Sequence, residues 1–117
     1  MTPTLKNVVV LAIAVIAFGL TRAESASPHV SIMDLGTLPG DDESAAGNIN
    51  ERGQVVGYSD NGLGAFHAFL FENGTMIDLG TLPNGVYSMA LAINERGQVV
   101  GWSDNGSFLD QSVLWTR

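Results

Sequence analysis

Three pairs of side chains that could bind a ligand recur at a spacing of 44 residues. They are an aromatic pair, an acidic pair and a basic pair: Tyr58 and Trp102, Asp60 and Asp104, and Arg52 and Arg96. Exposed aromatic rings could stack on the faces of sugars. The short oxygen ligands around each aspartate suit calcium. The arginines could form a ligand-binding rim.

Each pair also has a structural explanation. Aromatic residues at strand positions belong to the core more often than to a binding surface. Asp60-Asn61-Gly62, which recurs from Asp104, is what a tight turn requires. The arginines directly follow Glu51 and Glu95, and charges in such turns are normally solvated. The structural explanation is favoured for all three pairs, and ligand binding through them stays the alternative.

Two further groups could bind a metal ion. His67 stands between Phe66 and Phe69, but the only other histidine is His29, so a hydrogen-bonded role in or beside a sheet is favoured. Asp41-Asp42-Glu43 could hold calcium, but the spacing fits no EF-hand loop and the second copy has no acidic residue there. A solvated loop is therefore favoured for the acidic cluster.

The chain lacks the motifs of catalytic sites. No serine has a nucleophile motif around it, and no glycine-rich phosphate loop precedes a helix. The sequence contains no cysteine, which excludes disulfides, thiolate metal sites and a cysteine nucleophile. We therefore predict that the protein is not an enzyme and carries no cofactor, with calcium as the one metal that its oxygen ligands could bind.

The first 23 residues have the pattern of a cleavable signal peptide. A short basic start, residues 1–6, precedes an apolar run, and Thr21-Arg22-Ala23 supplies small residues for the peptidase. The uncharged run from Val8 to Leu20 is shorter than the roughly 20 residues that a spanning helix needs. We predict cleavage after Ala23, a flexible start over residues 24–29, and a secreted or periplasmic mature protein with no membrane span.

The mature chain is strongly acidic. The formal charge of the whole sequence is −7, and removal of Lys6 and Arg22 with the signal takes it to −9 and leaves no lysine. Such a chain repels nucleic acid and anionic lipid, so neither is an expected partner. Without disulfides, its stability must come from packing or from association.

An internal repeat accounts for the whole mature chain after its predicted flexible start. The block Asp34 to Pro39 returns at Asp78 to Pro83, and Ile49 to Gly57 returns unchanged at Ile93 to Gly101. The offset of 44 divides the chain into repeat 1, residues 30–73, and repeat 2, residues 74–117. Internal repetition at such a period is typical of solenoids and propellers.

Each repeat reads as four short antiparallel strands separated by turn residues. Asn50-Glu51-Arg52-Gly53 predicts a type I turn with a G1 bulge between two strands, and Asn94 to Gly97 repeats it. The pattern predicts an all-β fold of two four-stranded, propeller-blade-like repeats after the signal peptide. The expected strands are residues 31–35, 45–49, 54–59 and 68–71, and then 75–79, 89–93, 98–103 and 112–115.

These blocks resemble the bacterial extracellular repeat family called HAF. Its unit reads approximately D-L-G-T-L-G-G, then S-x-A-x-x-I-N-x-x-G-x-V-V-G-x-S, then H-A-F-x-W-x-x-G, and the name-giving triplet stands here as His67-Ala68-Phe69. Pro39 and Pro83 depart from the family pattern, as does Gln111-Ser112-Val113 in place of the second triplet. The resemblance implies a propeller or a propeller-like array and brings no catalytic residue or ligand.

Three functions fit this sequence. The first is an exported structural or interaction module, with another copy or a second protein as its partner. The second is a carbohydrate-binding, lectin-like module that oligomerisation completes, with a glycan as its ligand. The third is that the chain is a fragment of a longer repeat protein, because repeat arrays normally need at least three units or dedicated caps.

Overall fold

The computed structural model describes residues 28–117. The predicted signal peptide, residues 1–23, and most of the predicted flexible start lie outside the described residues. Within residues 28–117 every regular element is a β-strand, so the all-β prediction is confirmed. This part of the chain contains no helix with the length and hydropathy needed to cross a membrane.

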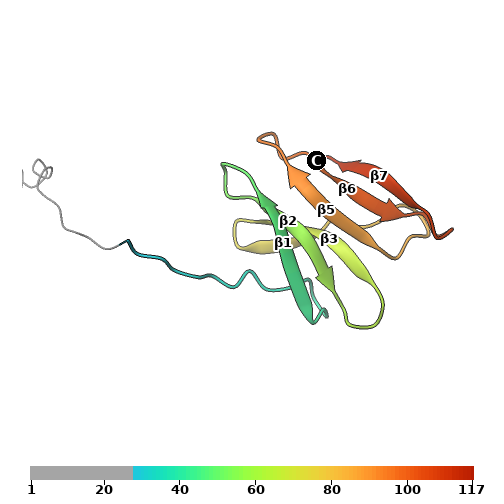
Figure 1. Cartoon of the computed structure of the whole chain (residues 1–117), viewed down its shortest axis with the longest axis horizontal. Helices are drawn as coiled ribbons and strands as arrows, with labels where there is room; N and C mark the ends of the chain where they lie inside the picture. Colours follow the sequence, from blue (N-terminus) through green and yellow to red (C-terminus); the bar gives the residue numbers. More distant parts are fainter. Residues whose placement is uncertain (1–27) are drawn as a thin grey trace, which may run out of the picture. The chain divides into compact units, whose positions relative to one another are not determined.

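The strands form two open antiparallel sheets within the compact unit Asp34–Arg117 (Figure 1). Sheet A has the order β1-β2-β3-β4, with β1 Glu43–Ile49, β2 Val55–Asp60, β3 Phe66–Glu72 and β4 Thr75–Asp78. Sheet B has the order β5-β6-β7, with β5 Ser88–Ile93, β6 Val99–Asp104 and β7 Asp110–Trp115.

The expectation of one four-stranded sheet in each repeat is correct only in part, because seven of the eight expected strands are present and they form sheets of four and three strands. The segment predicted as a strand at residues 31–35 has no strand conformation, whereas its counterpart β4 pairs with β3 at the edge of sheet A. Since β4 belongs to repeat 2, sheet A takes its fourth strand from the following repeat. No strand of the described residues does the same for sheet B, which therefore has three strands. The remaining strands lie within two residues of their predicted bounds.

The predicted turns between the first two strands of each sheet are confirmed. Gly53 N donates to Asn50 O at 3.0 Å, and Asn50 N donates to Gln54 O at 3.1 Å. Gly53 has a φ of 80°, which is the left-handed conformation that a G1 bulge requires and that favours glycine. Asn50 Oδ1 accepts from Arg52 N and Gln54 N, so the side chain closes the turn.

Gly57 and Gly101 stand opposite a bulge in the neighbouring strand. The register of β1 against β2 shifts between Ala46 and Asn48, and the register of β5 against β6 shifts at the equivalent place. A Cβ on Gly57 would collide with the carbonyl oxygen of Ala45, and one on Gly101 would collide with that of Met89. The bulge in the neighbouring strand brings its backbone against the glycine, so a residue without a Cβ is required at both positions.

The core lies between the two sheets, because β5 packs against β2 and β3 of sheet A. Each sheet contributes three buried apolar residues to this cluster, which are Val56, Ala68, Leu70, Ala90, Ile93 and Val99. Burial of a valine, leucine or isoleucine side chain contributes about 1.5–3 kcal/mol relative to exposure. The junction between sheet A and sheet B is therefore a main source of stability for residues 34–117.

Candidate functional site

The first turn of each sheet touches its counterpart in the other sheet. Asn50 Nδ2 donates to Asn94 O at 2.9 Å, and Glu51 N donates to the Glu95 carboxylate at 2.9 Å. The residues in each of these contacts are 44 positions apart, so identical parts of the two repeats contact each other. The junction is thus a repeat-to-repeat interface inside one chain.

The junction brings the two predicted arginines together. Arg52 and Arg96 both line a pocket of about 410 Å³, and Arg117 lines it too. Arg52 Nη2 donates to Gln54 Oε1 at 3.0 Å. All three cationic residues that follow the predicted signal peptide therefore line one pocket of an acidic protein. The rest of the lining is polar or backbone: Gln54, Glu72, Gly97, Gln98 and Thr116.

Glu72 is the acidic residue of the arginine pocket. Its carboxylate accepts from Gln54 Nε2 at 2.7 Å and from Arg117 Nη1. These hydrogen bonds, first that from Gln54 and then that from Arg117, favour the charged form and lower the pKa of Glu72 below its usual value. Sequence reasoning missed Glu72 and Arg117, although the scarcity of cations in the mature chain was a signal for the second.

An aromatic cluster surrounds Phe66 and contains both predicted aromatic residues. The Phe66 ring centroid lies 5.5 Å from that of Tyr58, 5.9 Å from that of Trp102 and 5.1 Å from that of Tyr87. Tyr58 and Trp102 meet Phe66 edge to face, and all four rings are half-buried. Such geometry contributes packing energy between rings. The cluster holds the two repeats together and leaves only part of each ring for a ligand.

Phe66 and Tyr87 were not among the predicted residues. Repeat 2 has Asp110 at the position of Phe66, and repeat 1 has Glu43 at the position of Tyr87. The cluster therefore forms once, at the junction, where a parallel bridge also joins Phe66 to Tyr87. A search for features common to both repeats could not find it.

Asp104 is buried and stabilises a loop. Its Oδ1 accepts from Tyr87 N at 2.7 Å and from Val86 N at 2.8 Å, and its Oδ2 accepts from Gly106 N at 3.1 Å. These backbone donors, that of Tyr87 foremost, lower the pKa of Asp104. Both of its carboxylate oxygens accept backbone hydrogen bonds, so the role of Asp104 is to stabilise the loop.

Asp60 has a smaller structural role in repeat 1. Its Oδ1 accepts from Gly62 N at 2.6 Å, as an aspartate at the start of a tight turn does. The structure gives Asp60 and Asp104 separate turns and does not join them in one site. Within residues 28–117 no group of three or more histidine, aspartate or glutamate side chains has a geometry that could hold a metal ion.

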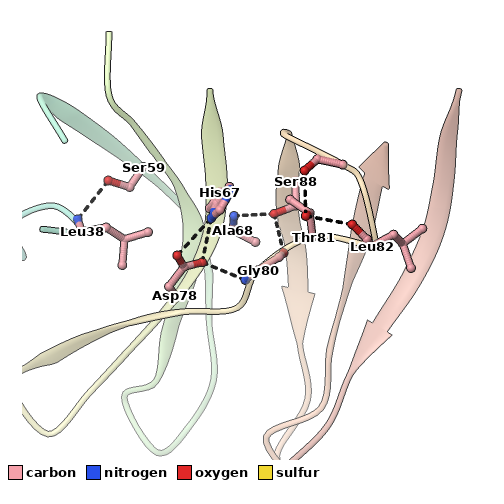
Figure 2. A network of polar contacts seen from close by, with 10 residues as sticks. Leu38, Ser59, His67, Ala68, Asp78, Gly80, Thr81, Leu82 and Ser88 are labelled. Carbon is pink, nitrogen blue, oxygen red and sulfur yellow. Dashed lines mark hydrogen bonds and ion pairs between the residues drawn. The ribbon is translucent and has the colours of Figure 1, made fainter. Parts of the chain in front are cut away.

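His67 is hydrogen-bonded beside the sheet, as its favoured structural role predicts. Its Nδ1 lies 3.0 Å from both carboxylate oxygens of Asp78, and Asp78 Oδ1 accepts from Gly80 N at 2.8 Å (Figure 2). The contact joins β3 to β4 within sheet A. The contact therefore helps to hold β4, the strand that repeat 2 contributes to sheet A, against β3.

Ser88 links the two sheets through its hydroxyl group. Its Oγ accepts from Ala68 N at 2.8 Å and donates to Gly80 O at 2.8 Å (Figure 2). In repeat 1 the counterpart Ser44 donates to Gly36 O at 2.7 Å and is exposed. Ser44 is thus held as Ser88 is, but in the described residues it has no counterpart of Ala68 N.

Three apolar residues that are buried at the junction have exposed counterparts in the other repeat. Val56 and Leu70 of sheet A are 0% and 1% exposed, whereas their counterparts Val100 and Leu114 in sheet B are 46% and 57% exposed. In the opposite direction, Ile93 of sheet B is 9% exposed and its counterpart Ile49 in sheet A is 64% exposed. Sheet B therefore has an uncovered copy of the face that sheet A buries, and β1 has an uncovered copy of the surface that β5 buries.

Comparisons with protein-family models, with curated proteins and with solved structures found no match to this chain. The resemblance to HAF repeats rests on the residues quoted for it and stays a prediction.

Proposed function

We propose that this chain is an exported interaction module whose β repeats self-associate into a propeller-like array. The observation that carries the proposal is the uncovered pair of apolar surfaces. We call the Val100 and Leu114 surface of sheet B the tail face, and the Ala46 and Ile49 surface of β1 the head face. Export rests on the signal-peptide pattern in residues 1–23.

The occupant that fits the tail face is the head face of a second copy. Inside the chain, Val56 and Leu70 pack with Ala90 and Ile93. A shift of 44 residues converts the first two into Val100 and Leu114, and a shift back converts the second two into Ala46 and Ile49. The side chains match in type at all of these positions. The internal junction is therefore a template for a contact between copies.

A contact between head and tail is heterologous. Each copy presents two different surfaces, so repetition of the contact gives a closed ring or an open filament, and not a two-fold dimer. Stacked four-stranded antiparallel sheets that cover each other's apolar faces are the plan of a propeller. The order of strands in sheet A supports this plan, with β4 as its last blade strand.

The oligomeric state tests the proposal. The full sequence is expressed with its own leader, purified after export, and examined by intact-mass measurement and by light scattering on a sizing column. We expect an N-terminus after Ala23 and a discrete oligomer. Leu114→Glu should give a folded monomer, because it places a charge in the tail face. The matched control is Leu63→Glu in the turn between β2 and β3, where the side chain is also exposed.

A mixing experiment distinguishes a heterologous contact from a symmetric one. Ile49→Glu damages only the head face and Leu114→Glu damages only the tail face, so each variant alone should be monomeric. An equimolar mixture should form a dimer through the one undamaged pair of faces. A wild-type protein that is monomeric at all concentrations would contradict self-association and favour a fragment of a longer repeat protein.

The arginine pocket favours a second candidate function, binding of a glycan that carries carboxylates. Arg52, Arg96 and Arg117 line one pocket of about 410 Å³, and arginine binds carboxylates with paired hydrogen bonds. Calorimetry with an oligomer of a uronic acid should detect binding that weakens at least tenfold in Arg96→Gln. A neutral oligosaccharide of equal length is the control, and equal binding of both sugars, or of neither, would contradict this function.

A further inference from the structure

We infer that Ser31–Asp34 of one copy forms the fourth strand of sheet B in another copy. The inference rests on the proposed self-association and adds to it a strand that one copy donates to the sheet of another. Sheet A obtains its fourth strand from the repeat that follows it, through β4. Residues 31–34 are the counterpart of β4 in repeat 1, and they form no strand in the described structure.

The edge that would receive this strand is β7. It is the last strand of sheet B, and its outer edge pairs with no strand of residues 28–117. Its counterpart β3 uses the same edge to bind β4. An unpaired edge presents a row of backbone donors and acceptors to another chain. The receiving edge, β7, and the segment that would pair with it, residues 31–34, are thus both present and both unpaired in the described residues.

The repeat also specifies the register of the pairing. In sheet A, Phe71 lies opposite Met76, and Leu70 lies opposite Ile77. A shift of 44 residues places Trp115 opposite Ile32 and Leu114 opposite Met33. At the ends of the same ladder, Glu72 with Thr75 becomes Thr116 with Ser31, and Phe69 with Asp78 becomes Val113 with Asp34.

The side chains of the donated segment agree with this role. Ile32 and Met33 are 97% and 71% exposed, whereas their counterparts Met76 and Ile77 are half-buried in sheet A. Ile77 packs against the core cluster between the sheets. Strand pairing on β7 would bury Ile32 and Met33 to the extent that Met76 and Ile77 are buried in sheet A.

Polar contacts are compatible with the same register. His67 contacts Asp78 in sheet A, and the corresponding pair would be Gln111 and Asp34. The Gln111 amide can donate to a carboxylate as the histidine ring does. Likewise, Ser44 Oγ, already held by Gly36 O, would accept from Ser112 N of the other copy as Ser88 Oγ accepts from Ala68 N.

A cysteine pair tests the register, because the natural sequence has no cysteine. The double variant Ser31→Cys with Thr116→Cys places two thiols directly opposite each other in the inferred ladder, within disulfide range. The control is Ile32→Cys with Thr116→Cys, since adjacent residues of the inferred strand 31–34 would point to opposite faces of the sheet. Both full-length variants are purified after export, oxidised mildly, and analysed on a non-reducing gel. The association of the wild type is measured in parallel on a sizing column.

We expect dimers and higher multiples in the first variant and at least tenfold less cross-linking in the control. Equal cross-linking in both variants, or a disulfide within single chains, would overturn the inference. Association of the wild type without register-specific cross-linking would overturn the strand exchange and leave the proposed self-association standing. A monomeric wild type would overturn the proposed function itself.

Discussion

The side-chain amide of Asn50 lies 2.9 Å from the carbonyl oxygen of Asn94, so one residue of repeat 1 binds the same residue of repeat 2. A hydrogen bond between equivalent positions has a direction, because Asn50 donates and Asn94 accepts. The Asn94 amide donates within its own turn, to Gln98 Oε1 at 2.7 Å, and Asn94 is exposed. Directional contacts of this kind extend from unit to unit and are typical of repeat arrays.

The asymmetry of this pair gives the first prediction. Asn50→Ala should lower the free energy of unfolding of the dilute protein by about 1–3 kcal/mol more than Asn94→Ala does. Both substitutions remove the same turn hydrogen bonds, in which the asparagine Oδ1 accepts from the backbone N–H groups two and four residues later. Only Asn50→Ala also removes the contact between repeats. Urea unfolding measures the difference, and equal effects would show that the contact contributes nothing.

Leu70 and Leu114 give a second matched pair. Leu70→Ala should lower the free energy of unfolding by about 2–5 kcal/mol at every protein concentration, because Leu70 is buried within one chain. Leu114→Ala should cost much less in dilute protein and approach that cost only at concentrations where the chain associates. Urea denaturation over a wide range of protein concentration separates the two. An equal cost in dilute protein would mean that Leu114 is already covered in the monomer.

Much of this fold could be predicted from the sequence because the repeat supplies two copies of each signal. Asn50 to Gly53 specifies its turn by local hydrogen bonds and by one positive φ, and both are short-range properties of the chain. The assignment of residues 31–35 to a strand failed for a different reason. A strand needs a partner, and the pattern of residues 31–35 says nothing about where the partner is.

The candidate site was predictable only where it repeats. Arg52 and Arg96 occupy equivalent turns, so the contact between repeats brings them to one pocket. Phe66 and Tyr87 each occur in one repeat alone, and only the junction reveals that they meet. The role of Asp104 depends on the backbone of Val86 and Tyr87, which the acidic loop of repeat 1 does not reproduce.

The glycine opposite each bulge gives a third prediction. Gly57→Ala should destabilise the protein strongly, by about 2 kcal/mol or more, because the new Cβ would collide with the backbone of Ala45. Gly47→Ala is the control, since the nearest atoms to a Cβ there are 3.6 and 3.7 Å away, which is ordinary contact. Thermal unfolding of both variants should show a large loss for the first and a small change for the second. Comparable melting temperatures would contradict the close approach.

The polar pair of His67 and Asp78 gives a fourth prediction. His67→Gln should change the free energy of unfolding by less than about 1 kcal/mol, because both side chains are partly exposed. Glutamine also stands at the equivalent position, Gln111. A larger loss, measured by urea unfolding, would show that the imidazole has a role that an amide cannot supply.

Asp104 gives a prediction for the dependence of stability on pH. Its pKa is lowered in the folded protein by the backbone donors of Tyr87, Val86 and Gly106, whereas an unfolded aspartate has a pKa of about 3.9. The charged carboxylate therefore stabilises the fold fully above that unfolded value, and this stabilisation is lost as the pH falls through the folded pKa. Asp104→Asn should lower stability at pH 7, and the deficit relative to the wild type should shrink in acid.

Asp60→Asn, which removes a carboxylate that accepts a single turn N–H, should cost less at pH 7. Urea unfolding between pH 7 and pH 3 checks both variants, and a deficit of Asp104→Asn that stays constant over this range would show that the charge of Asp104 does not stabilise the loop.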